Sequence, residues 1–167
     1  DVKSEFLEIK KLAEAQDFGS NKMGTRVSIK DESRKAYVSK VMSFINIEKM
    51  RPLNIVINCG NGTAGPTFDA IATKLMESQP CFKFTRMFHD VDSSFPNGIP
   101  NPLLEENQLP TMEKVISESA DLGVAFDGDF DRCFLFDECG HFVPGEYIVG
   151  LLAKIFLEKE PLSTIVH

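Results

Sequence analysis

The chain has 167 residues, of which 43% are hydrophobic and 26% are charged, enough to bury one core and part of a second. Its net charge of −7 is offset by no cluster of Lys and Arg, which excludes a broad surface for nucleic acid or for an anionic membrane. No apolar stretch reaches the roughly 20 residues that a membrane-spanning helix needs.

Both ends of the sequence indicate a piece of a longer protein. It begins at Asp1 without a methionine and ends in the strand-like run "STIVH". We expect residues 1–35 to be a helix and linker left from a preceding region. Residues 36–162 should form one α/β domain, and residues 163–167 should begin the next.

Apolar periodicity and turn residues predict the elements in chain order. The N-terminal part contains a helix over Phe6–Ala15, an aperiodic linker over Gly19–Lys30 and a helix over Glu32–Ile45. Then follow a strand over Leu53–Asn58, a helix over Thr67–Met76, a strand over Cys81–His89, a helix from Pro110 (in its first turn) to Ala120 and a strand over Asp121–Phe126. The last elements are a hairpin of Arg132–Asp137 and His141–Val143 around Glu138–Gly140, and a helix that Pro144 opens and that runs to Leu157. This order predicts an α/β fold. We expect a mixed, mostly parallel sheet of about four strands, helices on both faces, and a hairpin after the aspartate-rich loop described below.

The cysteines and histidines show no metal-binding pattern. The cysteines lie in or beside apolar runs, without CxxC spacing or a nearby pair of histidines, which disfavours zinc and predicts reduced thiols in a cytoplasmic protein; they are Cys59, Cys81, Cys133 and Cys139. Each histidine stands alone and is interpreted as a packed or solvated side chain rather than a catalyst; they are His89, His141 and His167.

A glycine-rich loop, "GNGTAG" (Gly60–Gly65), follows the first predicted strand of the α/β domain and opens a helix. It matches the dinucleotide fingerprint G-x-G-x-x-G, and Asp90 lies 25 residues past Gly65, at the end of the next strand. A dinucleotide domain, however, needs two βαβαβ halves, whereas this chain forms a hairpin after its third strand. Two alternatives stay open beside it: a tight turn in which the glycines take positive φ, and a helix N-terminus that contacts an anion.

The stretch "DGDFDR" (Asp127–Arg132) has an acidic spacing that imitates a calcium-binding EF-hand. Counted from Asp127, acidic residues occupy positions 1, 3, 5 and 12 of the loop; they are Asp127, Asp129, Asp131 and Glu138. Position 6 of an EF-hand must be glycine, but here it is Arg132, and the flanking segments are strand-like rather than helical. We therefore exclude an EF-hand.

The same three aspartates fit a magnesium site if the loop curls. In an extended strand, Asp127 and Asp131 would lie ~13 Å apart, too far to share one ion, and Gly128 makes the necessary bend easier. Three converging carboxylates form a hard, all-oxygen site suited to magnesium. Their charge of −3, the ion's +2 and the +1 of Arg132 sum to zero, so the site can accept a phosphoryl oxygen as a further ligand without accumulating charge. Arg132 can offer a planar fork of donors to the same phosphate. The alternative is a solvated acidic turn.

These motifs resemble those of the α-D-phosphohexomutases. "DGDFDR" is similar to the family's magnesium-binding loop, whose commonest form has glycine where this chain has Phe130. "NCGNGTAG" after the first strand, "FPNGIPNPLLEEN" (Phe95–Asn107) and "GVAFDGDFDRCFLFDE" then follow in the order found in the bacterial phosphomannomutases of the GDP-mannose pathway. The resemblance covers residues 37–162 and corresponds to the second of the family's four domains.

The resemblance implies a reversible phosphoryl transfer. A phosphoserine of the enzyme donates its phosphoryl group to mannose 1- or 6-phosphate. The resulting bisphosphate reorients and returns its other phosphoryl group to the serine. Asp127, Asp129 and Asp131 would hold Mg²⁺, with Arg132 as a catalytic residue. The family's serine loop, "TASHNP"-like, does not occur in this sequence, and "VDSSFPN" (Val91–Asn97) is interpreted as a plain loop.

The expected partners are therefore a hexose phosphate, bound through other domains of the same chain, with no nucleic acid and no membrane. We expect the chain alone to be inactive. A phosphoglucomutase or phosphoglucosamine mutase domain is the nearer alternative. A stand-alone module that binds a nucleotide or a divalent ion is the alternative of another class.

Overall fold

The computed structural model describes residues 2–16, 18–19 and 24–166 and divides the chain into two compact units, residues 1–33 and 34–167. The first unit contains α1 (Val2–Glu14), which confirms the predicted N-terminal helix. The predicted linker, Gly19–Lys30, lies partly outside the described residues, as does His167; residues 24–29 are exposed and have no regular secondary structure. Within the described ranges, no helix combines the length and the apolar character needed to cross a bilayer.

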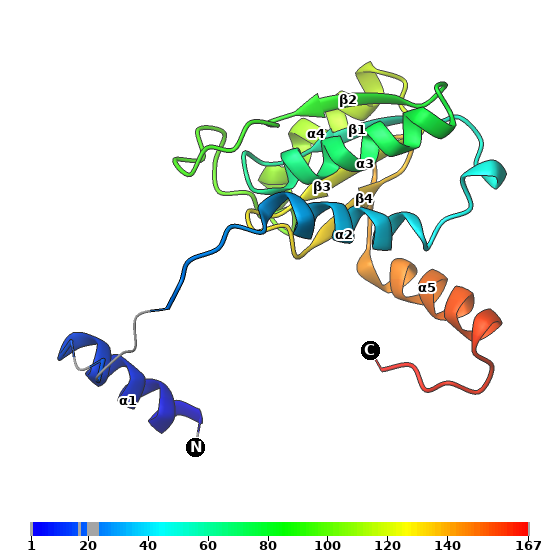
Figure 1. Cartoon of the computed structure of the whole chain (residues 1–167). Coiled ribbons are helices and arrows are strands. Elements are labelled where there is room, and N and C mark those ends of the chain that lie inside the picture. The colour runs from blue at the N-terminus through cyan, green and yellow to red at the C-terminus, as the bar shows by residue number, and fades with distance from the viewer. Residues whose placement is uncertain (1, 17, 20–23, 167) are drawn as a thin grey trace. The chain divides into compact units, whose positions relative to one another are not determined.

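The second unit is built on a five-stranded sheet in the order β2-β1-β3-β4-β5 (Figure 1). The strands are β1 (Asn54–Asn58), β2 (Lys83–Met87), β3 (Leu122–Phe126), β4 (Cys133–Phe136) and β5 (Phe142–Val143). β1 runs parallel to both β2 and β3, whereas β4 is antiparallel to both β3 and β5. The predicted α/β class is confirmed. The sheet is mixed rather than mostly parallel, because the hairpin contributes two antiparallel pairings.

Four α-helices and one short 3₁₀ helix accompany the sheet. They are α2 (Lys30–Met42), η1 (Ile47–Lys49), α3 (Ala64–Ser78), α4 (Glu105–Ser117) and α5 (Gly145–Lys159). The predicted helix over Glu32–Ile45 corresponds to α2, on which Val38 is buried. The helix that Pro144 opens is confirmed as α5, none of whose residues is buried.

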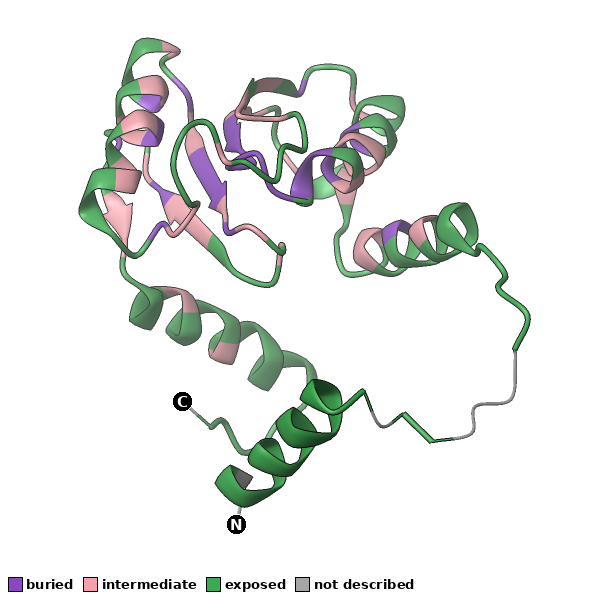
Figure 2. Ribbon diagram, turned by 90° about the vertical axis from the view of Figure 1, so that its left-hand side faces the viewer, coloured by how far each residue is buried: buried purple, intermediate pink, exposed green. Residues whose placement is uncertain are grey.

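Side chains of the central strands alternate between two apolar layers, one on each face of the sheet. Ile57 of β1 and Val124 of β3 belong to a buried cluster with α3. Val56 and Ala125, the neighbours of these residues in sequence, belong to a second cluster with α4. Figure 1 shows α3 and α4 on opposite faces, and Figure 2 shows that the buried residues gather in the sheet and in these helices. Burial on both faces explains why these strands read as nearly continuous apolar runs.

α4 begins earlier than the sequence predicts. The interpretation of Pro110 as a first-turn residue is wrong, because the helix starts at Glu105 and Pro110 lies inside it. Proline removes one helical hydrogen bond, the one to the carbonyl four residues before it. The first turn is supported instead by Asn107, whose Nδ2 donates to the carbonyl oxygens of Ile99 and Asn101, both at 3.1 Å.

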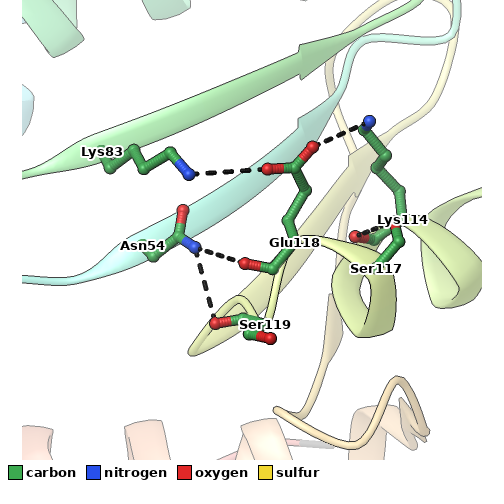
Figure 3. Close-up of polar contacts among 6 residues, drawn as sticks. All are labelled: Asn54, Lys83, Lys114, Ser117, Glu118 and Ser119. Atoms are coloured by element: carbon green, nitrogen blue, oxygen red, sulfur yellow. Dashed lines mark hydrogen bonds and ion pairs between the residues drawn. The ribbon is translucent and has the colours of Figure 1, made fainter.

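A polar network joins the end of α4 to the start of β1 (Figure 3). Nδ2 of Asn54 donates to the carbonyl oxygens of Glu118 (2.9 Å) and Ser119 (3.5 Å), directly after the helix. The carboxylate of Glu118 pairs with Lys114 at 2.9 Å and with Lys83 at 3.5 Å. The last carbonyls of a helix have no partner within it, so Asn54 supplies a donor that the helix itself cannot.

We predict that Asn54→Ala lowers the free energy of unfolding by about 1–2 kcal/mol, because the part-buried carbonyl of Glu118 loses its donor. Urea unfolding measures the change. Asn46→Ala is the matched control, since Asn46 is exposed and its side chain makes no capping hydrogen bond. Equal stability of the two variants would contradict the assigned role.

Candidate metal site

The aspartate loop joins the carboxyl end of β3 to the start of β4. Asp127 directly follows the last residue of β3, and Arg132 directly precedes β4. Ligands of open α/β sheets bind at the carboxyl ends of the strands. Strands, not helices, flank the loop, in agreement with the exclusion of an EF-hand.

The loop curls and brings its three carboxylates together. One oxygen from each of Asp127, Asp129 and Asp131 lies within 4.8 Å of the others. The N–H of Phe130 donates back to the carbonyl oxygen of Asp127 at 3.3 Å, and Phe130 has a φ of 68°. Asp127 is buried, with 1% of its surface exposed, whereas Asp129 and Asp131 are exposed.

This donor set fits a magnesium ion. Two oxygens bound to one Mg²⁺ at ~2.1 Å lie ~3.0 Å apart when adjacent and ~4.2 Å apart when opposite. The 4.8 Å limit is close to that range, and the exposed side chains of Asp129 and Asp131 can rotate to close the difference. Three carboxylate oxygens also match the preference of this ion for hard ligands.

Arg132 is bound to the buried carboxylate. Its backbone N–H donates to Oδ1 of Asp127 at 3.0 Å, and its Nε donates to Oδ2 of the same residue at 2.7 Å. Burial raises the pKa of Asp127, but these hydrogen bonds and the guanidinium charge outweigh it and hold the pKa below its ordinary value. Nε lies 3.5 Å from Asp131, and half of the Arg132 side chain is exposed. The side chain of Arg132 is thus partly accessible to an anion from solvent.

The outer part of the loop keeps an excess of negative charge. The pKa of Asp131 is raised, first by its hydrogen bond with Asp127 and then by partial loss of hydration and by the charges of Asp129 and Asp127. The nearby charge of Arg132 lowers this pKa without cancelling the rise. A divalent cation would relieve the remaining repulsion.

The glycine-rich loop forms a tight turn whose donors face the protein. Gly60 and Asn61 both have a φ of 56°. The N–H groups of Asn61, Gly62 and Thr63 donate to the carbonyl oxygens of Phe88 (2.7 Å), Cys59 (2.8 Å) and Gly128 (3.0 Å). Three successive donors that a pyrophosphate would need are already used. Of the three interpretations of this loop, the geometry favours the turn.

His89 lies in a chain of polar contacts that sequence reasoning missed. Its Nε2 is 2.8 Å from Oδ2 of Asp69, and its Nδ1 is 3.5 Å from Sγ of Cys59. The order cysteine, histidine, aspartate resembles a nucleophilic triad. Cys59 is fully buried, however, and burial raises its pKa to about 12, so the thiol is not a nucleophile. In the sequence, these contacts were indicated only by the positions of Cys59 and His89 at the ends of two predicted strands.

The turn between β4 and β5 brings together a second group of possible ligands. One ligand atom from each of Asp137, Cys139 and His141 lies within 4.8 Å of the others. Oδ1 of Asp137 accepts the backbone N–H groups of Cys139 (2.9 Å) and His141 (2.7 Å), so this carboxylate caps the turn. The alternate spacing of these residues across a predicted turn was the signal that could have identified the group.

Comparisons with known proteins identify the family. The family described as phosphoglucomutase/phosphomannomutase, alpha/beta/alpha domain II, matches residues 35–140, more than half of the chain. Over 161 residues the chain is 48% identical to a phosphomannomutase of Salmonella montevideo, covering 96% of this chain and 35% of that protein. Over 165 residues it is 44% identical to a phosphomannomutase of Vibrio cholerae, covering 96% and 34%.

A solved structure supports membership of the same family. A phosphoglucomutase/phosphomannomutase family protein of Burkholderia thailandensis superposes with a TM-score of 0.75 at 28% identity, covering 95% of this chain and 32% of that one. The chain belongs to the phosphoglucomutase/phosphomannomutase family and matches its second domain. It spans about a third of the length of the curated relatives.

We predict that Asp129→Asn raises the melting temperature in the presence of a chelator, because it removes one of the exposed, mutually repelling charges and keeps the side-chain shape. Asp127→Asn should lower it, since the buried partner of Arg132 would be lost. Thermal unfolding monitored by circular dichroism separates the two. A shift of the same sign in both variants would contradict the division between a buried, paired aspartate and an exposed, repelled one.

Proposed function

We propose that this chain is the magnesium-binding domain of a phosphomannomutase. The observation that carries the proposal is the convergence of Asp127, Asp129 and Asp131 at the end of β3, in a domain whose relatives are named phosphomannomutases. The three carboxylates would hold Mg²⁺. When bound, the ion supplies positive charge that stabilises phosphoryl oxygens during transfer.

Arg132 has two tasks in this proposal. Its Nε fixes the buried Asp127, which sets one ligand in place without the metal. Its half-exposed side chain would offer the remaining guanidinium donors to a phosphate as a planar, bidentate contact. Three carboxylates, one divalent ion and one guanidinium sum to zero charge, so the loaded site would not repel a phosphate as the three carboxylates alone would.

The reaction we propose for the whole enzyme interconverts mannose 1-phosphate and mannose 6-phosphate through a phosphoserine and a bisphosphorylated intermediate. The serine and the sugar-binding groups would come from other domains, so the chain alone is expected to be inactive. The division at residues 36–162 and a cytoplasmic location belong to the same proposal.

Two alternatives are less well supported. Glucose or glucosamine phosphates are chemically suited to the same metal loop, but the relatives described above carry the name phosphomannomutase. A stand-alone nucleotide-binding module is disfavoured because the amides of the glycine-rich loop are bonded within the protein. Assays of a full-length enzyme that carries this domain, with all three sugar phosphates, test the substrate directly.

We predict that magnesium reverses the order of melting temperatures found in chelator. Binding to the folded state adds RT ln(1 + [L]/Kd), about 1.4 kcal/mol at a tenfold excess over Kd. The unmutated chain gains this term, and Asp129→Asn gains little of it. Without a phosphate ligand, affinity should be weak and the shift visible only at millimolar Mg²⁺. If neither protein responds to magnesium, the loop is an acidic turn and the proposed metal function fails.

In a full-length enzyme that carries this domain, we predict that Arg132→Lys lowers kcat by about ten- to a hundredfold. Lysine keeps the charge but loses the fork that binds Asp127 and phosphate together. Steady-state kinetics with mannose 1-phosphate measure the effect. The matched control is Arg51→Lys, because Arg51 pairs with Asp121 directly before β3, at the opposite end of that strand from the aspartate loop. Near-normal kcat in Arg132→Lys would reject the role.

A further inference from the structure

Two motifs that the proposed function leaves unexplained meet at Gly128. They are the glycine-rich loop, Gly60–Gly65, and the loop over Phe95–Pro102. We propose that these two loops form a clamp that holds the aspartate loop in its metal-binding shape, with Phe95 and Asn97 as positioning residues. The inference rests on the proposed metal function, because Gly128 lies between the ligands Asp127 and Asp129.

One side of the clamp is a contact of backbone on backbone. The N–H of Thr63 donates to the carbonyl oxygen of Gly128 at 3.0 Å. A Cβ added to Gly62 would lie 2.5 Å from that oxygen and 2.9 Å from the Gly128 carbonyl carbon. Only glycine permits this approach, so the second glycine of "GNGTAG" is explained by the aspartate loop rather than by a dinucleotide.

The other side of the clamp is made of side chains. A Cβ added to Gly128 would lie 3.4 Å from Cζ of Phe95 and 3.5 Å from Cγ of Pro100, which is van der Waals distance. Pro100 also reaches the glycine-rich loop, since a Cβ on Gly60 would lie 2.3 Å from its Cβ. Gly128 thus lies between the backbone of the glycine-rich loop and the ring of Phe95, with room for no more than a methyl group on the side of the ring.

Asn61 fastens the two loops together. Its Oδ1 accepts Nδ2 of Asn97 at 2.8 Å, and its Nδ2 donates to the carbonyl oxygen of Asp90 at 2.9 Å. Its backbone N–H and carbonyl are bonded to Phe88 (2.7 Å) and Asp92 (2.9 Å). Asn61 is buried and has a φ of 56°, a left-handed conformation that asparagine tolerates better than most residues.

Phe95 is held in a strained conformation against the metal loop. It has a φ of 48°, which is unfavourable for a residue with a bulky side chain. Its N–H donates to the carbonyl oxygen of Asp92 at 3.0 Å, and its own carbonyl accepts the N–H of Gly98 at 2.9 Å. Such strain persists only where surrounding contacts fix it, and it is frequent at functional sites. Here it aims an aromatic ring at Gly128.

The clamp predicts that Phe95→Ala weakens metal binding beyond any effect on folding. Titration of the 167-residue chain with Mn²⁺, followed by electron paramagnetic resonance, should show about tenfold lower affinity, the size expected when a group that orients a ligand is removed. Phe95→Tyr keeps the ring and should restore the affinity. Ile99→Ala is the control, because Ile99 lies in the same loop, is 75% exposed and does not approach Gly128.

A second pair of variants tests the hydrogen bond. Asn97→Ala breaks the link to Asn61 and should also weaken Mn²⁺ binding severalfold. Ser94→Ala is its control, since the hydroxyl of Ser94 donates to Asp92, at 2.7 Å, just before that loop. Unchanged Mn²⁺ affinity in both Phe95→Ala and Asn97→Ala overturns the clamp.

Amide hydrogen exchange of the metal-free chain separates the clamp from the metal function. The amides of Thr63 and Arg132 bond to Gly128 and Asp127, so Phe95→Ala should make them exchange faster than Ile99→Ala does. If the unmutated chain binds no Mn²⁺, the proposed function fails, and these exchange rates alone decide the clamp. Equal rates in Phe95→Ala and Ile99→Ala then overturn it.

Discussion

The carboxylate of Asp127 is the interaction on which the site depends. It is buried, and a buried charge is costly unless it is paired and hydrogen-bonded. Arg132 donates two hydrogen bonds to this carboxylate, one from its backbone N–H and one from Nε. The five residues from Asp127 to Asp131 must therefore form a tight turn. The same closure sets the antiparallel pairing of β4 with β3, in which Phe126 lies opposite Cys133. One ion pair therefore closes both the aspartate loop and the β3–β4 hairpin.

This arrangement divides the three aspartates by role. The carboxylate of Asp127 is hydrogen-bonded within the protein, whereas those of Asp129 and Asp131 are exposed and leave an excess of negative charge at the surface. The first carboxylate can be held in place with or without a metal, and the other two become favourable only when a cation arrives. A preorganised ligand lowers the ordering cost of binding, while the two exposed ones provide the electrostatic gain. In the proposed site, the metal would therefore be exchangeable rather than built into the fold.

The local features of the chain could be predicted from sequence, and the contacts between distant segments could not. Strands such as Asn54–Asn58 follow from apolar patterning, and the curl of the aspartate loop follows from the distance that its carboxylates must close. Pro110 misled the prediction because Asn107 supports a helical turn before it. The contacts of Gly62 with Gly128, and of Cys59 with His89, arise because a parallel sheet gathers strand ends that are far apart in sequence.

Phe130 shows how packing can replace the conformational freedom of glycine. Its φ of 68° is one that glycine adopts without strain. The left-handed backbone costs a residue with a Cβ roughly 1–2 kcal/mol. Its ring packs edge-to-face on Phe126, with centroids 4.8 Å apart, and such a pair contributes about 0.5–1.5 kcal/mol in addition to the apolar area it buries. The two effects are similar in size, so the ring contact offsets most of the cost of the left-handed backbone. The same contact ties the loop between Asp129 and Asp131 to the last residue of β3.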